Sequence, residues 1–361
     1  MDLQPTESID MSELLLRRRN LLLRKQEELN IRAVCFEADG EQTVSITKVG
    51  TAPTITMQYS YDGVTWNAWN LSALPFGGST KVYVRGVNNE RFGADGSNYN
   101  KITFSTDAFV YVSGIVESLL DGENEVLAFS YPGALRNLFY QQTALRSAEN
   151  LKFETTTTSG YSACYSFTFA GCTNLLYAPK ALSIEILGTG YECASMFQDC
   201  KSLLTAPTLP ATTLTQYCYQ NMFQGCTSLI SAPKLPATKL ASNCYRFMFR
   251  DCKSLVNAPE LPATTLADLC YVNMFRNCSS LVNAPELPAT TLAPQCYQYM
   301  FYSCTSLKTI RCRAKVTASS ATVYWLYGVS SSGTLYGHSE YGWSSGVSGI
   351  PSGWEFVELT D

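Results

Sequence analysis

The chain has 361 residues and a formal net charge of −4, so it is long enough for several structural units and lacks the basic surplus of a nucleic-acid-binding protein. Charged residues make up only 16% of it, against about 25% in typical soluble domains. A hydrophobic content of 46% still allows a sizeable core. This composition favours a stable extracellular or particle-borne protein and argues against nucleic acid as a partner.

Residues 1–30 predict an amphipathic attachment helix. Leu15, Leu22 and Leu29 recur at heptad spacing. This is the spacing of a short coiled coil, so we expect the segment to assemble the protein as a homotrimer or dimer. The segment lacks the order of a signal peptide and has no apolar run of about 20 residues, so we expect folding in a cytoplasm. Its arginines leave two alternatives open: a helix on a membrane surface, or a helix packed on its own chain.

Residues 31–118 predict a small all-β sandwich domain with several short strands. The sequence ITMQYSYDGVTWNAWNL has alternating apolar runs on both sides of Asp62 and Gly63, which is the pattern of a β-hairpin. The turn resembles the Asp-box hairpin of some glycan-processing proteins, although it is one residue short. Trp66 and Trp69 are candidates for stacking on a sugar, but we expect at least one of them to belong to the core.

The rest of the chain predicts a repeat array between two caps. Residues 119–160 are less regular and are interpreted as a junction with the N-terminal cap. Within 161–312 a cysteine returns at a constant interval, at positions 200, 226, 252, 278 and 304, and the interval from position 172 to position 200 is slightly longer. A fixed period of 26 residues, the step from position 200 to position 226, indicates a solenoid. Residues 313–361 are expected to form the C-terminal cap.

One period reads C-Y-x-x-M-F-x-x-C-x-S-L-x-x-A-P-x-L-P-A-T-x-L. The Cys-x₃-Met-x₃-Cys part predicts a short helix of about two turns, and Ser-Leu-x-x-Ala predicts a short parallel strand that ends at the proline. One such coil cannot bury its own apolar face, but identical coils stacked on each other can. The cysteines are then expected to be small buried hydrophobes, not metal ligands, and no cofactor is expected.

These letters resemble the BspA-like leucine-rich repeats, whose signature is similar to the MFxxCxSLxxAP string of this chain. The family occurs in surface proteins of gut Bacteroides and in phages that infect them. The resemblance covers roughly 160–312. It is strengthened by the tail GTLYGHSEYGWSSGVSGIPSGWEFVEL, which is similar to the closing segment of such proteins, and by VESLLDG at 116–122. It implies a leucine-rich-repeat solenoid of short parallel strands and short helices. The absence of an export signal favours the phage members.

No motif in the sequence indicates catalysis. The single histidine, His338, lies in a glycine- and serine-rich tail, where we expect an exposed loop residue. The repeats differ from each other at the two positions after Cys-Tyr and at the two positions before the second cysteine. Residues that vary in this way should face solvent, and a row of them along a repeat array is a candidate ligand surface. The candidates in this row are Arg246, Phe247, Arg250, Arg276, Tyr299 and Tyr302.

The sequence therefore predicts a multidomain protein with an N-terminal helix, a β sandwich, a repeat solenoid and a C-terminal cap. We expect a non-enzymatic virion component: a head or tail fibre or decoration protein of a phage. Its partners would be other capsid or tail proteins, further copies of itself, and a glycan or protein on the host surface. The alternative is a leucine-rich-repeat adhesin on the surface of a Bacteroides cell. The sequence does not choose between head and tail.

Overall fold

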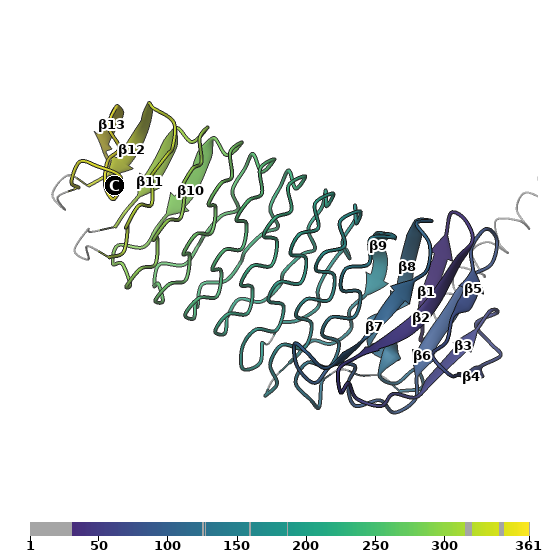
Figure 1. Ribbon diagram of the computed structural model, residues 1–361. Helices are drawn as coiled ribbons and strands as arrows, with labels where there is room; N and C mark the ends of the chain where they lie inside the picture. Colours follow the sequence, from purple (N-terminus) through teal and green to yellow (C-terminus); the bar gives the residue numbers. More distant parts are fainter. Residues whose placement is uncertain are drawn as a thin grey trace, which may run out of the picture.

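The computed structural model describes residues 31–360 except 125, 127, 159, 186, 315–319 and 339–342. The predicted helix that carries Leu15, Leu22 and Leu29 lies outside the described residues. Within them the fold is built mostly of strands, and the one helical element is the short 3-10 helix η1 (Val116–Leu119). The strands up to residue 152 lie at one end of an elongated stack of coils, and those from residue 283 onward lie toward its other end (Figure 1).

The N-terminal part forms two sheets. The larger has the strand order β4-β3-β6-β1-β8-β9, and the smaller has the order β5-β2-β7. Phe36 in the larger sheet contacts Phe76 and Phe104 of the smaller sheet, with ring centroids 6.2 and 5.6 Å apart. The predicted hairpin is present as the antiparallel pair of β3 and β4. The strands are β1 (Val34–Ala38), β2 (Gln42–Val49), β3 (Met57–Ser60), β4 (Asn67–Trp69), β5 (Leu74–Phe76), β6 (Val82–Gly86), β7 (Tyr99–Phe104), β8 (Val110–Ile115) and β9 (Leu145–Lys152).

The larger sheet continues directly into the coils. β9 pairs in parallel with β8, so a single sheet crosses the predicted boundary at residue 118. Glu117 is fully buried at this joint. Its carboxylate accepts hydrogen bonds from the Tyr165 hydroxyl and from the backbone N–H groups of Glu154 and Thr155, both at 3.1 Å. Desolvation raises the pKa of Glu117 although these bonds oppose the shift, so one buried acid ties η1, the end of β9 and the repeats together.

The Cys-x₃-Met-x₃-Cys segments are consecutive turns, and the prediction of a short helix in each repeat is wrong. In the segment 217–226 the N–H groups of Tyr219, Asn221 and Phe223 donate to carbonyl groups of the next coil, at 2.9–3.0 Å. The residues between them donate to the carbonyl three positions back, as Met222 does to Tyr219. The chain also adopts a left-handed φ at every fourth residue, for example 59° at Tyr217 and 55° at Asn221. An α-helix allows neither feature.

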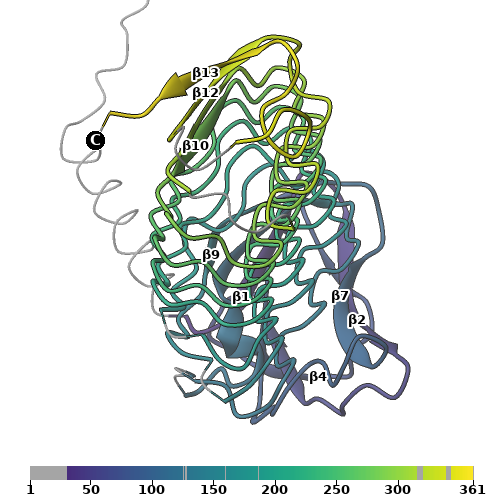
Figure 2. The same ribbon diagram turned by 90° about the vertical axis from the view of Figure 1, so that its left-hand side faces the viewer.

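The spacing of the coils explains why a helix does not form. The rings of Phe223, Phe249 and Phe275 are nearly parallel, with centroids 5.6 and 5.7 Å apart. Packed α-helices need about 8–10 Å between their axes, so they do not fit at this separation. A flattened chain of turns does fit, and it can also donate every second N–H to its neighbour. Seen nearly along the stack from its C-terminal end, the coils lie one behind another with similar outlines (Figure 2).

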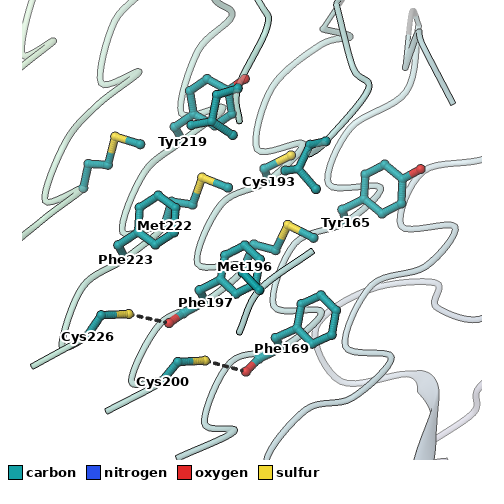
Figure 3. Packing of buried hydrophobic residues seen from close by; sticks show 14 of the residues in the cluster. Tyr165, Phe169, Cys193, Met196, Phe197, Cys200, Tyr219, Met222, Phe223 and Cys226 are labelled. Carbon is teal, nitrogen blue, oxygen red and sulfur yellow. Dashed lines mark hydrogen bonds between the residues drawn. The ribbon is translucent and has the colours of Figure 1, made fainter. Parts of the chain in front are cut away.

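The core of the stack consists of side-chain rows that run from coil to coil. One row of stacked phenylalanines extends from Phe139 to Phe301, with centroid separations of 5.2–5.7 Å. A second row of stacked tyrosines extends from Tyr219 to Tyr297 and continues through Trp325 to Trp343. Figure 3 shows the phenylalanine row beside the methionines and cysteines of neighbouring coils.

The second cysteine of each repeat has a specific partner. Its thiol donates to the backbone carbonyl of the phenylalanine in the preceding coil, as in the 3.1 Å contacts of Cys200 with Phe169 and Cys226 with Phe197 (Figure 3). The same contact, at 3.0–3.1 Å, recurs from Cys172 to Cys304. The cysteine is therefore a hydrogen-bond donor as well as a small buried side chain, and alanine or valine would leave part of this carbonyl's hydrogen-bonding capacity unused.

The opposite side of the coils carries the parallel strands. β10 (Asn283–Leu287), β11 (Thr309–Cys312), β12 (Gly333–Gly337) and β13 (Trp354–Glu358) form a four-stranded parallel sheet. Earlier coils are joined on this side by isolated parallel bridges, such as that between Ser231 and Asn257. The sequence predicts that the strand of each repeat ends at the proline, but β10 contains Pro285. The register shifts between Asn283 and Glu286, and such an irregularity accommodates a residue without an N–H group.

The longer interval between the cysteines at 172 and 200 leads into a coil that departs from the repeat pattern. At the coil that ends in Cys200, Glu192 occupies the place of the first cysteine, and Cys193 occupies the place of the tyrosine. Glu192 is fully buried, and it accepts hydrogen bonds from the Gly190 N–H at 2.6 Å and the Thr215 hydroxyl at 3.0 Å. The longer loop thus supplies a donor to a buried carboxylate, and Cys193 interrupts the tyrosine row between Tyr165 and Tyr219 (Figure 3).

A matched pair of substitutions tests the stacked core. Phe249→Ala removes a fully buried ring from the middle of the phenylalanine row, and we expect it to lower the free energy of unfolding by about 3–5 kcal/mol. Phe247→Asn is the control, because Phe247 is only half-buried and asparagine occupies the same position in neighbouring coils. Chemical denaturation should show a large fall in midpoint for the first variant alone. Equal effects would contradict this account of the core.

Candidate functional site

The residues predicted to bind a ligand lie on the edge of the stack formed by the turn segments, which we call the turn face. Arg246, Phe247 and Arg250 come from one coil, Arg276 from the next, and Tyr299 and Tyr302 from the one after. All six side chains are half-buried, in contrast to the Cys, Met and Phe residues beside them in sequence, which are fully buried. The solvent-facing position inferred from their variability is in agreement with this burial.

The structure brings these residues into two contacting groups. The guanidinium groups of Arg246 and Arg250 lie 4.8 and 5.4 Å from the ring centroid of Phe247. The guanidinium of Arg276 lies 4.6 Å from the ring centroid of Tyr302, which is 5.9 Å from Tyr299. Each arginine therefore packs on an aromatic ring along the turn face. Because these contacts already restrict the arginine side chains, little further conformational entropy is lost when a ligand binds.

Two further tyrosines belong to this surface and were not predicted. Tyr324 stacks on Tyr299 at 5.6 Å, and Tyr327 stacks on Tyr302 at 4.9 Å. They are 43% and 44% exposed, which is high for large aromatic side chains. They were missed because their coil contains neither repeat cysteine. The signal was the Tyr-x-x-Tyr spacing that Tyr299 and Tyr302 also have. The six predicted residues and these two tyrosines are called the turn-face patch.

The backbone conformation restricts which residue types fit at the varying positions. Asn221, Phe247, Asn273 and Tyr299 occupy equivalent places in successive coils, and their φ angles are 54–58°. Asparagine tolerates this left-handed conformation, whereas a bulky aromatic residue there is strained. Part of the variation between repeats is thus explained by backbone geometry. Phe247 and Tyr299 adopt this conformation although it strains them, and strained residues of this kind cluster at functional sites.

The charge on the patch is mostly positive. Arg250 Nε lies 3.2 Å from the Asp251 carboxylate, and the same carboxylate accepts a 2.6 Å hydrogen bond from the Asn277 side chain. Among the ion pairs of the described chain, none includes Arg246 or Arg276. The patch therefore combines aromatic rings with guanidinium groups and can bind an oxygen-rich or anionic partner.

A hollow of about 920 Å³ lies over the outer face of β1, β8 and β9. Ile31, Cys35, Tyr83, Leu151 and Phe153 contribute to its wall, and charged residues of both signs line the rest. Ile31 is the first described residue of the chain.

The structure assigns the other candidates of the sequence to the scaffold. Trp69 is 6% exposed and donates its indole N–H to the Ser72 carbonyl, so the expectation that one tryptophan belongs to the core is confirmed. The Arg85 guanidinium covers the Trp66 ring at 4.2 Å. Asp62 accepts hydrogen bonds from the N–H groups of Val64 and Thr65, at 2.8 and 2.7 Å, which hold its pKa well below the usual range. These contacts organise the hairpin turn.

His338 is not the exposed loop residue that the sequence predicted. It follows β12, its side chain is only 15% exposed, and its Nδ1 lies 3.7 Å from a carboxylate oxygen of Glu358 at the end of β13. This contact joins two neighbouring strands of the parallel sheet.

The cysteines form neither disulfides nor a metal centre in the described chain. All fourteen thiols are free and buried, and no group of three or more candidate metal ligands occurs among the described residues. Burial raises the pKa of the Cys172, Cys244 and Cys312 thiols from 9.0 to about 12. Because the thiolate is the nucleophile, these groups are chemically quiet at neutral pH.

None of the helices in the described residues is long and apolar enough to span a membrane. Comparison of the chain with protein-family models, with curated proteins and with solved structures gives no match.

The buried thiols make stability sensitive to alkali. They stay protonated in the folded protein up to about pH 12, whereas the same thiols in the unfolded chain ionise near pH 9. The free energy of unfolding should therefore be unaffected by the thiols below pH 9 and should fall as the pH rises from 9 to about 12. The slope is at most about 1.4 kcal/mol per pH unit for each thiol.

Urea denaturation at pH 8 and at pH 10.5, combined with titration by a thiol reagent, measures this effect. We expect a lower midpoint at pH 10.5 and reaction of the thiols at pH 8 only after unfolding. Rapid reaction of several thiols in the native protein at pH 8 would show that the rows of cysteines are accessible.

Proposed function

We propose that this protein is a non-enzymatic component of a phage particle, a fibre or decoration protein of the head or tail. It attaches and oligomerises through its N-terminal part and displays a leucine-rich-repeat solenoid with a C-terminal cap. The turn-face patch then contacts a glycan or protein on the host surface. The single observation that carries this proposal is the division of the coils into a uniform buried core and a turn face that differs from coil to coil.

The contacts between coils support the solenoid. Backbone N–H groups, phenylalanine rings and cysteine thiols all find partners one coil away, from residues 134–142 to residues 321–328. A spine held together in this way has few degrees of freedom to lose when it binds a partner. The resemblance of the repeats to the BspA-like family supports the assignment to a Bacteroides phage, and the alternative is a surface adhesin of such a bacterium.

The composition of the patch supports a binding role. Arginine and tyrosine are the residues that most often dominate binding energy at protein surfaces. Here Arg276, Tyr302 and Tyr327 form one continuous group, since Arg276 contacts Tyr302 and Tyr302 stacks on Tyr327. A neutral polar surface would be sufficient if the turn face served solubility alone.

Substitution within the patch tests its role. Arg250→Gln, Arg276→Gln and Tyr302→Gln each introduce the residue that Gln224 provides at the equivalent position of another coil, so the fold should be retained. We expect the triple variant of the full chain to bind a panel of Bacteroides strains at least about tenfold more weakly than the unmodified protein, because desolvated arginine and tyrosine contacts are lost. Flow cytometry with the fluorescently labelled proteins measures this.

Lys201→Gln and Lys253→Gln, on exposed residues just beyond the turn segments, serve as the control. Equal cell binding by the triple variant, the control and the unmodified protein would remove the patch from the proposal. Mass spectrometry of purified particles of a phage that carries the gene tests whether the protein is a virion component.

Removal of residues 1–30 tests the attachment segment. If Leu15, Leu22 and Leu29 form a coiled coil, the full chain should be a trimer or dimer, and the chain that begins at Ile31 should be a monomer with the same circular dichroism per residue in the strand region. Size-exclusion chromatography with light scattering gives both masses. An unchanged oligomer after truncation would contradict an assembly role for this segment.

A further inference from the structure

A second hollow lies on the turn face near the beginning of the stack, and its last lining residues, Gln220 and Asn221, are in the coil next to the one that carries Arg246 of the turn-face patch. It has a volume of about 400 Å³, and its wall is drawn from successive coils. Arg136 and Phe167 contribute to the wall from the first coils, Tyr191 and Ser195 from the next, and Gln220 and Asn221 from the one after. No motif of the repeat pattern marks this place.

Small side chains in one coil create the hollow. At the two positions after the Cys-Tyr pair, most coils carry at least one large residue, such as Phe167 before the hollow and Gln220 with Asn221 after it. In the coil between them these two positions are Ala194 and Ser195. Neighbouring coils are 5.2–5.5 Å apart at the phenylalanine row here, so the truncated side chains leave a notch between two larger neighbours.

The wall presents a cation that makes no close ion pair. The Arg136 guanidinium lies 5.2 Å from the ring centroid of Phe167, and its buried Nε has no hydrogen-bond partner in the described structure. None of the ion pairs found within 4 Å among the described residues includes Arg136, and Asp95 attracts it only from beyond this distance. A planar guanidinium held against a ring in this way is suited to a carboxylate.

The rest of the wall suits a sugar ring. Tyr191 is 44% exposed, and its ring is held by stacking on Tyr217 at 4.5 Å with planes 15° apart. On the far side, the side-chain oxygens of Gln220 and Asn221 are buried without hydrogen-bond partners in the described structure. These oxygens are shielded from solvent, so the amide N–H groups of the same side chains are the ones open to a ligand. A fixed aromatic face beside amide N–H groups suits an amphipathic, hydroxyl-rich ring.

We propose that this hollow, called the Arg136 notch, binds one carboxylate-bearing monosaccharide unit of a surface glycan, such as a uronic acid or a sialic acid. The carboxylate pairs with Arg136, an apolar face of the sugar ring packs on Tyr191, and the hydroxyl groups reach the Ser195 hydroxyl and the side-chain N–H groups of Gln220 and Asn221. This inference rests on the proposed contact of the turn face with host glycans, and it names the class of sugar and a second place for it.

Saturation-transfer NMR on the full chain tests the notch with defined probes: the methyl glycosides of glucuronic acid and of N-acetylneuraminic acid, with methyl glucoside as the neutral comparison. At about 10 mM sugar, a site with a millimolar Kd is largely occupied. We expect saturation transfer to at least one acidic sugar and a signal at least about fivefold weaker for the neutral one.

Two variants follow from the repeat itself. Arg136→Gln introduces the residue found at the equivalent positions Gln220 and Gln298, and Ser195→Phe introduces the ring found there as Phe167 and Phe247, in the same left-handed conformation. We expect the first to weaken acidic-sugar binding about tenfold and the second to abolish it by filling the notch. Arg276→Gln, in the turn-face patch, should leave it unchanged.

The outcomes separate the two proposals. Absence of binding of both acidic sugars to the unmodified protein, or equal binding by the Ser195→Phe variant, overturns the notch without touching the cell-binding result for the patch. Loss of sugar binding in Arg276→Gln but not in Arg136→Gln would place the acidic sugar in the patch and also overturn the notch. Thermal denaturation of each variant verifies that it is folded.

Discussion

The whole structure depends on the pairing of each coil with its copy one repeat away. Where the stacked phenylalanine rings are 5.2–5.7 Å apart, the backbone N–H groups reach the next coil, and the second cysteine of each repeat reaches a carbonyl in the coil before. All three contacts require the same register between neighbouring coils. A residue inserted within a repeat would displace all of them together, and Glu192 shows that a longer loop is tolerated where it supplies a compensating hydrogen bond.

This constraint also decides where the chain is free to vary. Inside the stack each side chain packs against the equivalent side chains of the coils on both sides, so a substitution in one coil disturbs the packing of two others. On the turn face most of the varying side chains are only half-buried, and the rows can carry arginine, tyrosine, glutamine, alanine or serine. The turn-face patch and the Arg136 notch arise from this freedom in opposite ways. The patch is built by adding large side chains, and the notch is built by leaving them out.

The sequence predicted the repeat period and the buried residues, because identical pockets require identical residues, and it predicted the row of varying residues because these do not repeat. It did not predict the turns, since apolar residues at i and i+4 fit an α-helix as well as a strict period of four. Turns form in place of helices because neighbouring coils lie too close together for helices, and this spacing cannot be read from a single repeat. Tyr324, Tyr327 and Arg136 were missed because their coils lack the repeat cysteines, and the notch depends on residues that are small.

Deletion of one whole repeat is the most direct measurement of the central claim. Removing residues 253–278 excises one full period and joins equivalent points of two coils, so every row regains a partner. The account predicts a folded protein with cooperative denaturation, an unchanged circular dichroism spectrum per residue and a shorter maximum dimension in small-angle X-ray scattering. Removing residues 253–265, half a repeat, should unfold or open the stack. If both deletions gave equally folded proteins, pairing in register at this period would not be what holds the structure together.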